Sequence, residues 1–424
     1  MSSHFVRILS LLVVAILSVS LLSGCNGAES ASPPSAGLTV AAGDGQVTVS
    51  WQMDSGVDYW LFYAPGTNVV AGQPSTGYVS KMNISSPYIL TGLTNGSTYA
   101  FVLNGRKNGG PGGPSTPVVT VTPRPAGSTW QRGGAGGSAD LRGIAYGTAS
   151  SGTAYYDAVG NSGSMYQSTD GITWVATAGN WAGVAGATNF NATLYASSKF
   201  IAVGAAGKIF YSSDNVNWAA GTYPTPPATM PTLNALASNG ARIAAVGSGG
   251  SIFYSDDGGV TWLGANVPAG SGDLNGVAYS TSSARWVAVG ARGMLVTSTD
   301  GSNWSAVTAA TPSTTNDLKG IAVLADGTKF AAVGNGGTVL TSSDGQIWTS
   351  QVLSGNADLL AVGAHTSGTN EFVAVGAAGA AFTSLDGITW VAQATGTAVN
   401  LLGVISAAGQ FVAVGQVGTS IYSR

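Results

Sequence analysis

A short polar stretch that ends in tryptophan recurs between residues 168 and 390 at a nearly constant spacing. Its fullest copy reads S-D-D-G-G-V-T-W at residues 255–262, and five shorter copies read S-x-D-[GN]-x-x-W. The central aspartates stand 42 to 44 residues apart, at Asp170, Asp214, Asp257, Asp300, Asp344 and Asp386. A regular period of this length indicates several copies of one supersecondary unit, stacked or arranged radially. The repetition constrains the architecture of the chain far more than its ligand.

Each repeat contains four short runs with the composition of β-strands. In one copy, L-N-G-V-A at 274–278 is followed by W-V-A-V-G at 286–290, a Gly-rich turn and a third apolar run, and a fourth run begins at the tryptophan of the motif. Short runs rich in Val, Ile, Ala and aromatic residues, bounded by Gly, Ser, Asn or Asp, are typical of strands and turns. Four strands per repeat predict one blade of a β-propeller.

The recurring motif itself has the composition of a turn. Its aspartate can accept hydrogen bonds from nearby backbone N–H groups, and its glycine can adopt a positive φ. Its tryptophan offers a large apolar face to the next repeat. We therefore interpret the six aspartates as structural rather than catalytic.

The two ends of the repeat region predict the number of blades. Residues 128–130 read S-T-W, the tail of a motif without its front, and the sequence stops at residues 421–424, where a further motif would begin. Counting from Trp130 gives seven units. An N-terminal strand that completes the last unit would close the ring and remove an open sheet edge. We expect a seven-bladed propeller over residues 129–424.

The repeat resembles a known class of sequences over that whole region. The motif resembles the Asp-box, or BNR, repeat of sialidases, and the full unit is similar to the propellers of photosystem II assembly factors and their bacterial relatives. The resemblance implies a propeller whose Asp-boxes lie on the face opposite the loops that enter each blade. It implies little about activity, because propellers host unrelated functions.

The first 25 residues have the pattern of a targeting segment. Arg7 precedes an apolar run at 8–22, and L-S-G-C follows at 22–25. The last four residues resemble the lipobox of bacterial lipoproteins, which implies a signal peptide over residues 1–25 and a lipid anchor on Cys25. Cys25 is the only cysteine, so no disulfide can form within the chain. Asn26, the residue after this cysteine, resembles the residue that directs bacterial lipoproteins to the outer membrane. The alternative for the whole segment is a plain signal peptide with an incidental cysteine.

The segment between the targeting region and the repeats has a different pattern. Residues 26–36 are small, polar and proline-containing, which is typical of a flexible tether. Residues 37–123 contain short alternating strands such as Q-V-T-V-S-W at 46–51, which favour a β-sandwich. This unit resembles a fibronectin type III domain, with Trp51 in the core and a tyrosine corner at 93–99. Residues 124–128 then form a linker.

Composition and residue counts limit the possible chemistry. Only 8% of the 424 residues are charged and the net charge is −3, which argues against a nucleic-acid-binding surface. After the targeting segment, His365 is the only histidine, so a zinc site or a Ser/His nucleophile is excluded. Asp256 and Asp257 suggest calcium, but they lie within a motif and serve the turn in the simpler interpretation. We expect no metal and no cofactor.

A sialidase-like activity requires residues that the repeat region largely lacks. The family resemblance implies an arginine triad, a Tyr/Glu nucleophile pair and an aspartic acid. Glu371 is the only glutamate after residue 29, and the arginines of the region show no such pattern: Arg132, Arg142, Arg242, Arg285, Arg292 and Arg424. We therefore expect a protein that is not an enzyme, with glycan cleavage as the alternative.

Aligned repeats place one short polar residue just before each innermost strand. These residues are Asp140, Asn189, Thr232, Asp273, Asp317, Asp358 and Asn400, with Arg142 and Lys319 two positions further along. They are expected to ring one mouth of the propeller, together with Arg292 in a Gly-rich turn. They form either a binding face or a set of caps for turn N–H groups.

Two aromatic residues in loops at the same mouth are candidate ligand contacts. Trp181 and Tyr223 are expected to stack on a sugar or anchor a partner protein, or else to pack between blades.

The sequence thus predicts a monomeric, non-catalytic lipoprotein of the cell envelope, in the outer membrane rather than the inner. It would hold its propeller away from the membrane and engage a protein partner or assembly intermediate, with no nucleic acid involved. The alternative is a glycan-binding or glycan-cleaving, sialidase-like protein.

Overall fold

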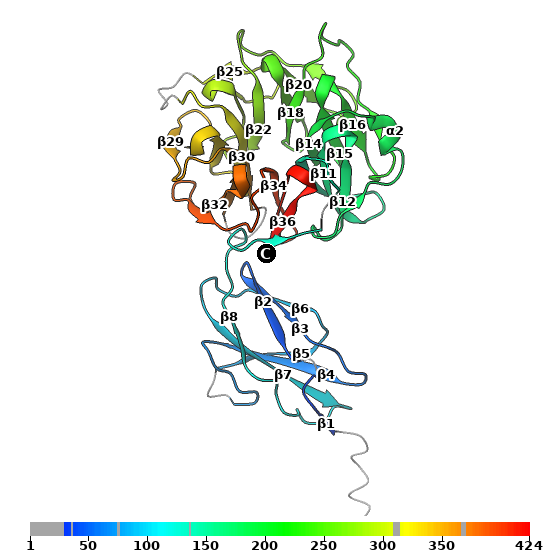
Figure 1. Cartoon of the computed structure of the whole chain (residues 1–424), viewed down its shortest axis with the longest axis vertical. Helices are drawn as coiled ribbons and strands as arrows, with labels where there is room; N and C mark the ends of the chain where they lie inside the picture. The colour runs from blue at the N-terminus through cyan, green and yellow to red at the C-terminus, as the bar shows by residue number, and fades with distance from the viewer. Residues whose placement is uncertain (1–28, 35–36, 74–76, 135–136, 308–313, 366–369) are drawn as a thin grey trace, which may run out of the picture. The chain divides into compact units, whose positions relative to one another are not determined.

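The computed structural model describes residues 29–34, 37–73, 77–134, 137–307, 314–365 and 370–424, and it forms two compact units, Met1–Pro125 and Ala126–Arg424. Figure 1 shows that both units consist almost entirely of strands and turns. Cys25 and the rest of the expected targeting segment lie outside the described residues. In the described part of the chain, no helix has the length and apolar composition needed to cross a membrane.

The first unit consists of two antiparallel sheets that share one apolar core. One sheet contains β1 (Glu29–Ala31), β7 (Tyr99–Lys107), β4 (Asp58–Pro65) and β5 (Val79–Ile84), with β8 (Val119–Val121) also on β7. The other contains β2 (Thr39–Gly43), β3 (Gln46–Ser50) and β6 (Tyr88–Thr91). Trp51 lies in this core at 5.6 Å from the ring of Tyr59. The Tyr99 hydroxyl accepts a hydrogen bond from the N–H of Thr94.

Part of the expected tether belongs to the first sheet. Glu29–Ala31 pairs with β7, with Ala31 opposite Gly105, and the side chain of Ala31 is buried. The tether prediction for residues 26–36 is therefore wrong over this strand. Its small polar composition did not reveal the pairing, because the hydrogen bonds come from the backbone.

The second unit contains seven four-stranded antiparallel sheets within its described residues, numbered 1 to 7 below. The first three are β10 (Leu141–Thr148), β11 (Ala154–Gly160), β12 (Met165–Ser168) and β13 (Val175–Ala176); β14 (Phe190–Ala196), β15 (Lys199–Gly204), β16 (Ile209–Ser212) and β17 (Ala219–Ala220); and β18 (Leu233–Ser238), β19 (Ile243–Gly247), β20 (Ile252–Ser255) and β21 (Leu263–Gly264). A short helix, α2 (Trp181–Ala185), lies in the loop between the first two.

Sheets 4 to 6 repeat the same order of strands. They are β22 (Leu274–Ser280), β23 (Arg285–Gly290), β24 (Leu295–Ser298) and β25 (Ser305–Ala306); β26 (Leu318–Val323), β27 (Phe330–Gly334), β28 (Thr338–Ser342) and β29 (Thr349–Val352); and β30 (Leu359–Ala364), β31 (Phe372–Gly376), β32 (Ala381–Ser384) and β33 (Val391–Gln393). Sheet 7 contains β34 (Leu401–Ala407), β35 (Gln410–Gly415) and β36 (Ser420–Ser423), and its fourth strand is β9 (Gln131–Arg132).

The sheets form a closed ring. Each first strand contacts the first strand of the next sheet, and β34 of sheet 7 contacts β10 of sheet 1, so that the sheets surround a common centre (Figure 1). The strand from the start of the unit completes the last sheet, with Gln131 opposite Tyr422 and Arg132 opposite Ile421. This pairing is the one that the S-T-W remnant at residues 128–130 predicts.

The two ends of the unit also rebuild a seventh copy of the motif turn. The Ser423 hydroxyl accepts a hydrogen bond from the N–H of Gly127 at 2.8 Å, as the Ser168 hydroxyl does from Gly171 at 2.9 Å. Ala126 takes the place of the aspartate and is fully buried. Residues 126–128 therefore pack as part of the ring, which corrects their assignment to the linker at 124–128.

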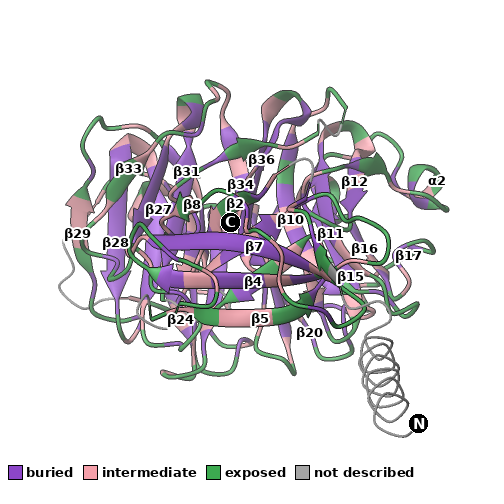
Figure 2. Ribbon diagram, turned by 90° about the horizontal axis from the view of Figure 1, so that it is seen from below, coloured by how far each residue is buried: buried purple, intermediate pink, exposed green. Residues whose placement is uncertain are grey.

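The core of the second unit lies between neighbouring sheets. Trp262, at the end of the motif in sheet 3, belongs to one apolar cluster with Ile201 and Val203 of sheet 2 and Ile243 of its own sheet. Figure 2 shows the buried residues along the strands and the exposed ones in the connecting turns. The alternation of apolar runs and polar turns in the sequence is thus the alternation of interior and surface.

Candidate functional site

The motif turns use their polar groups internally. The Asp300 carboxylate accepts hydrogen bonds from the backbone N–H groups of Ser302 and Asn303, both at 2.8 Å, and from the Ser298 hydroxyl at 3.0 Å. Partial burial raises the pKa of Asp300, but these hydrogen bonds outweigh it and hold the pKa well below its ordinary value. The carboxylates of the other copies accept equivalent bonds and also have lowered pKa values: Asp170, Asp214, Asp257, Asp344 and Asp386.

The motif end of the ring also carries a series of contacts between sheets. The residue that begins the second strand, or directly precedes it, donates to the carbonyl of the motif aspartate in the next sheet. The donor and acceptor pairs are Lys199 and Asp257, Arg242 and Asp300, Lys329 and Asp386, and Gln410 and Asp170. Most of the polar groups at this end thus hold the ring together rather than face a ligand.

Neither a metal site nor an accessible catalytic glutamate is found in the described residues. Asp256 forms an ion pair with Arg242 at 2.7 Å, and no group of three or more His, Cys, Asp or Glu side chains in the described ranges could hold a metal ion. Glu371 is 1% exposed, and its carbonyl accepts the N–H of His365. A glutamate buried in this way cannot contact a substrate at the surface.

The strand registers place the start of each inner strand at the end of the ring away from the motifs. In sheet 1, Leu141 pairs with Gly160 at one end of β11, whereas Ser168 pairs with Tyr156 at the other. At the Leu141 end, a tight turn joins the second and third strands of each sheet. These turns are η2 (Asn161–Gly163), η3 (Ala205–Gly207), η4 (Ser248–Gly250), η5 (Ala291–Gly293), η6 (Asn335–Gly337), η7 (Ala377–Gly379) and η8 (Gln416–Gly418).

The seven aligned polar residues lie at these turns, and we call them the cap ring: Asp140, Asn189, Thr232, Asp273, Asp317, Asp358 and Asn400. Each backbone carbonyl accepts the N–H of the first residue in the turn of its own sheet. Six of the side chains also accept the N–H of the middle turn residue in the preceding sheet, at 2.8 to 3.1 Å: Asp140 from Val417, Asn189 from Ser162, Asp273 from Gly249, Asp317 from Arg292, Asp358 from Gly336 and Asn400 from Ala378. The cap ring therefore joins neighbouring sheets, as the capping alternative requires.

The two candidate aromatic residues also serve the packing at this end. Trp181 is 3% exposed, lies 4.8 Å from the ring of Phe190, and donates its indole N–H to the carbonyl of Gly163. The expectation of an exposed stacking surface is therefore wrong for Trp181. Tyr223 is half-buried and its hydroxyl donates to the carbonyl of Gly207; burial raises its pKa above the ordinary value.

A second set of seven residues at the same end was largely missed in the sequence. In every sheet the register between the first and second strands shifts at the second residue of the inner strand, so that this residue is a β-bulge. A bulged residue is unpaired and its side chain is re-aimed. The bulged residues, which we call the bulge ring, are Arg142, Asn191, Asn234, Asn275, Lys319, Leu360 and Leu402; all are exposed or half-buried.

Three amides in the bulge ring link consecutive sheets. The Nδ2 atom of Asn191 donates to the carbonyl of Leu233 at 3.0 Å, Asn234 donates to Leu274 at 2.9 Å, and Asn275 donates to Leu318 at 2.9 Å. These bonds span the boundaries from sheet 2 to sheet 5. The polar side of the bulge ring therefore has a structural role.

The cations at this end are less fully engaged. Lys319 forms an ion pair with Asp317 at 3.1 Å, and the Nε of Arg142 donates to Asn161 at 2.8 Å. The ion pairs found among the described residues are Lys319 with Asp317 and Arg242 with Asp256, so the exposed Arg142 and Arg292 have none there. These two guanidinium groups can donate hydrogen bonds to an anionic partner.

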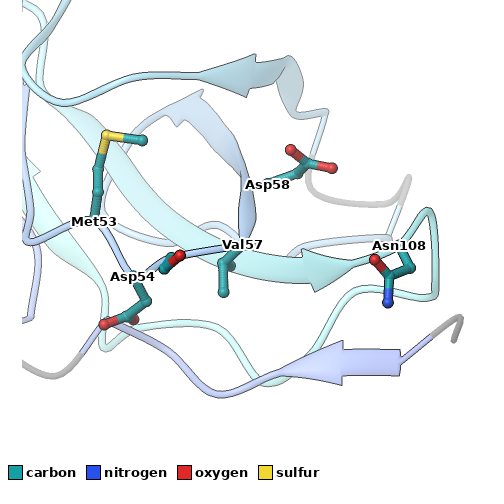
Figure 3. Close-up of a pocket in the computed structure, with 7 residues that line it drawn as sticks. Met53, Asp54, Val57, Asp58 and Asn108 are labelled. Atoms are coloured by element: carbon teal, nitrogen blue, oxygen red, sulfur yellow. The ribbon is translucent and has the colours of Figure 1, made fainter.

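A hollow in the first unit offers a different set of groups. It measures about 670 Å³ and is lined by the loop before β4, the start of that strand and Asn108 (Figure 3). Its acids are Asp54 and Asp58, and Asp54 accepts a hydrogen bond from the Tyr59 hydroxyl at 2.7 Å. Nothing else in the hollow indicates a ligand.

Comparison with known proteins identifies the architecture. No protein-family model matches the chain, and no curated protein matches it. Among solved structures, YCF48 from Cyanidioschyzon merolae is 17% identical, with a TM-score of 0.55, over 70% of this chain and 99% of that one. The chain has a β-propeller fold.

Two further solved structures support this fold. YCF48 bound to D1 peptide matches with 18% identity and a TM-score of 0.54, over 69% of this chain and 96% of that one. The WD40 β-propeller domain of Doa1 matches with 10% identity and a TM-score of 0.54, over 70% of this chain and 97% of that one. At these identities the likeness concerns the propeller fold alone.

Proposed function

We propose that this chain is a non-catalytic binding protein whose seven-bladed Asp-box propeller engages a segment of a partner protein at its bulge-ring end. The observation that carries the proposal is the difference between the two ends. At the motif end, Arg242 and Lys329 donate to motif carbonyls of the next sheet. At the bulge-ring end, Arg142 and Arg292 are exposed and form no ion pair among the described residues, so open cations rather than apolar exposure distinguish this end. Open cations beside the half-exposed Leu360 and Leu402 suit a protein ligand.

A solved propeller of similar fold supports this choice of ligand class. YCF48 is described in complex with a D1 peptide, so a propeller of this fold can receive a peptide. Sugar stacking has no comparable support here, because Trp181 is buried.

The proposal includes the membrane attachment that the sequence predicts. We propose that Cys25 carries lipid, and that the fibronectin type III-like unit holds the propeller away from the outer membrane within the cell envelope. Several acyl chains together anchor a protein firmly. Replacement of Cys25 by serine should therefore move the protein from the membrane to the soluble fraction in cell fractionation, and retention in the membrane would disprove the anchor.

The binding face can be tested by site-specific photo-cross-linking in the host cell. A photo-reactive residue replaces either Leu402, in the bulge ring, or Ile388, which is 61% exposed in a motif turn. The proposal predicts a cross-linked partner protein from position 402 and none from position 388. Adducts from position 388 alone, or from neither position, would disprove the assignment of the face.

A further inference from the structure

One side of the bulge ring is apolar, and hydrogen bonding between sheets does not explain its residues. In sheets 2 to 4 the bulged residue is an asparagine whose amide donates to the next sheet. In sheets 6 and 7 the same position holds Leu360 and Leu402, which cannot donate. Both are half-exposed, whereas Leu359 and Leu401 before them are fully buried.

The two leucines occupy equivalent positions on neighbouring inner strands, and the strand on each side of them has a basic residue at that position. Sheets 5, 6, 7 and 1 follow one another around the ring through contacts between their inner strands. In that order the bulged residues are Lys319, Leu360, Leu402 and Arg142. Four consecutive sheets of the seven therefore present an apolar pair between two basic residues.

The acids at this end are already engaged by the protein. Asp317 accepts the N–H of Arg292 and pairs with Lys319, and Asp140 accepts the N–H of Val417 and the amide of Asn161. Asp358 accepts the N–H of Gly336. Of the two basic residues beside the leucines, Lys319 is ion-paired, whereas Arg142 is exposed and forms no ion pair among the described residues, so Arg142 is the one open to a carboxylate.

We infer that Leu360, Leu402 and Arg142 together recognise a peptide segment in which apolar side chains stand next to a carboxylate. The leucines cover the apolar side chains of the segment. Arg142 pairs with its carboxylate through two N–H groups of the guanidinium, one for each carboxylate oxygen. This inference rests on the proposed function and specifies the partner segment.

The test measures binding of three labelled peptides to the full-length protein by fluorescence anisotropy. The first peptide carries two adjacent leucines flanked by aspartates, the second has lysines in place of the aspartates, and the third has serines in place of the leucines. We expect the first to bind at least tenfold more tightly than either of the others. Equal affinity for the first and third would overturn the inference.

Substitutions that imitate the other sheets separate recognition from folding. The double variant Leu360→Asn and Leu402→Asn installs the residue found at this position in sheets 2 to 4, so its melting temperature should be close to that of the unchanged protein. We expect it to bind the leucine peptide at least tenfold more weakly. Arg142→Gln should weaken binding severalfold and reduce its dependence on salt.

A matched control removes apolar surface at the opposite end. Leu385 and Ile388, 58% and 61% exposed in the motif turn of sheet 6, are replaced by asparagine. Unchanged binding by this control with loss in the Leu360 and Leu402 variant supports the inference, and the reverse pattern overturns it. A protein cross-linked from position 402 that lacks an acidic and apolar segment would also overturn it while leaving the proposed function intact.

Discussion

At the scale of single residues, one sheet contains a buried acid where the others are apolar. Asp157 in β11 occupies the position of Ile201, Val287 and Val412, and it is fully buried. Its carboxylate accepts a hydrogen bond at 2.7 Å from Asn215, which replaces the glycine of the motif in sheet 2 and has a φ of 61°. Asparagine tolerates this conformation better than most residues, so Asp157 and Asn215 form a matched pair.

This pair predicts an unusual dependence of stability on pH. Burial raises the pKa of Asp157 to about 7, against the opposing effect of the Asn215 hydrogen bond. Because the folded pKa is above the unfolded one, near 4, the folded protein binds the extra proton between these values, and stability falls as pH rises from about 4 to about 7. The unfolding free energy, compared with that of Asp157→Asn, should fall by about 2 kcal/mol between pH 5 and pH 8.

Urea unfolding of both proteins at the two pH values provides the measurement. The comparison with Asp157→Asn removes the contribution of other titrating groups, including the motif aspartates, whose lowered pKa values act below about pH 4. Parallel pH profiles for the two proteins would show that Asp157 does not titrate in this range.

At the scale of elements, the last glycine of each second strand is required by space rather than by its dihedral angles. Gly290 has a φ of −168°, which any residue can adopt. A Cβ added there would overlap the carbonyl oxygen of Asp273, and the same is true of Gly334 against Asp317 and Gly376 against Asp358. These glycines let the cap ring reach the turns.

Gly290→Ala should therefore destabilise the propeller by about 3 kcal/mol, because the backbone of β23 or of the cap ring must move. Gly264→Ala is the matched control, since a Cβ at this exposed strand position meets nothing within 4 Å. It should change the stability by less than about 0.5 kcal/mol. Thermal unfolding of the two variants compares them, and equal effects would contradict the spatial argument.

At the scale of the whole molecule, stability depends on the closure of the ring by residues from its two ends. Gly127 has a φ of 88°, and a Cβ there would lie 2.7 Å from Val373 in sheet 6. Gly240, with a φ of 94°, has open space around it. Both Gly127→Val and Gly240→Val strain the backbone, but only the former disturbs the closure.

We expect the melting temperature of Gly127→Val to lie about 5 °C or more below that of Gly240→Val, because the clash adds to the common strain. Differential scanning calorimetry distinguishes the two variants. Equal melting temperatures would mean that residues 126–130 do not hold the ring closed.

The sequence predicted repeating features better than contacts between repeats. The spacing of the motif predicted four-stranded units, and the S-T-W remnant predicted the strand that completes sheet 7. Alignment of the repeats places the cap-ring residues correctly. Their side chains, however, accept hydrogen bonds from turns of the preceding sheet, and the sequence of a single repeat does not show which turn each side chain contacts. The bulge ring was missed except for Arg142 and Lys319, because its residues differ in type from sheet to sheet.

The burial of a loop residue was equally hard to predict. Trp181 is followed by Ala and Gly and looks exposed in sequence, yet it fills space between sheets 1 and 2 with Phe190 and Trp218. The composition of Glu29–Ala31 predicts a tether, because backbone pairing leaves no mark on side-chain composition.

Hydrogen exchange of the full-length protein, with and without the leucine and aspartate peptide, tests most directly whether one end of the propeller binds and the other holds it together. We expect slower exchange on peptide binding at residues 140–144, 358–362 and 400–404, around the bulge ring. We expect no change at residues 298–304 and 384–390, in the motif turns. Protection of the motif turns with none around the bulge ring would contradict this assignment of the two ends.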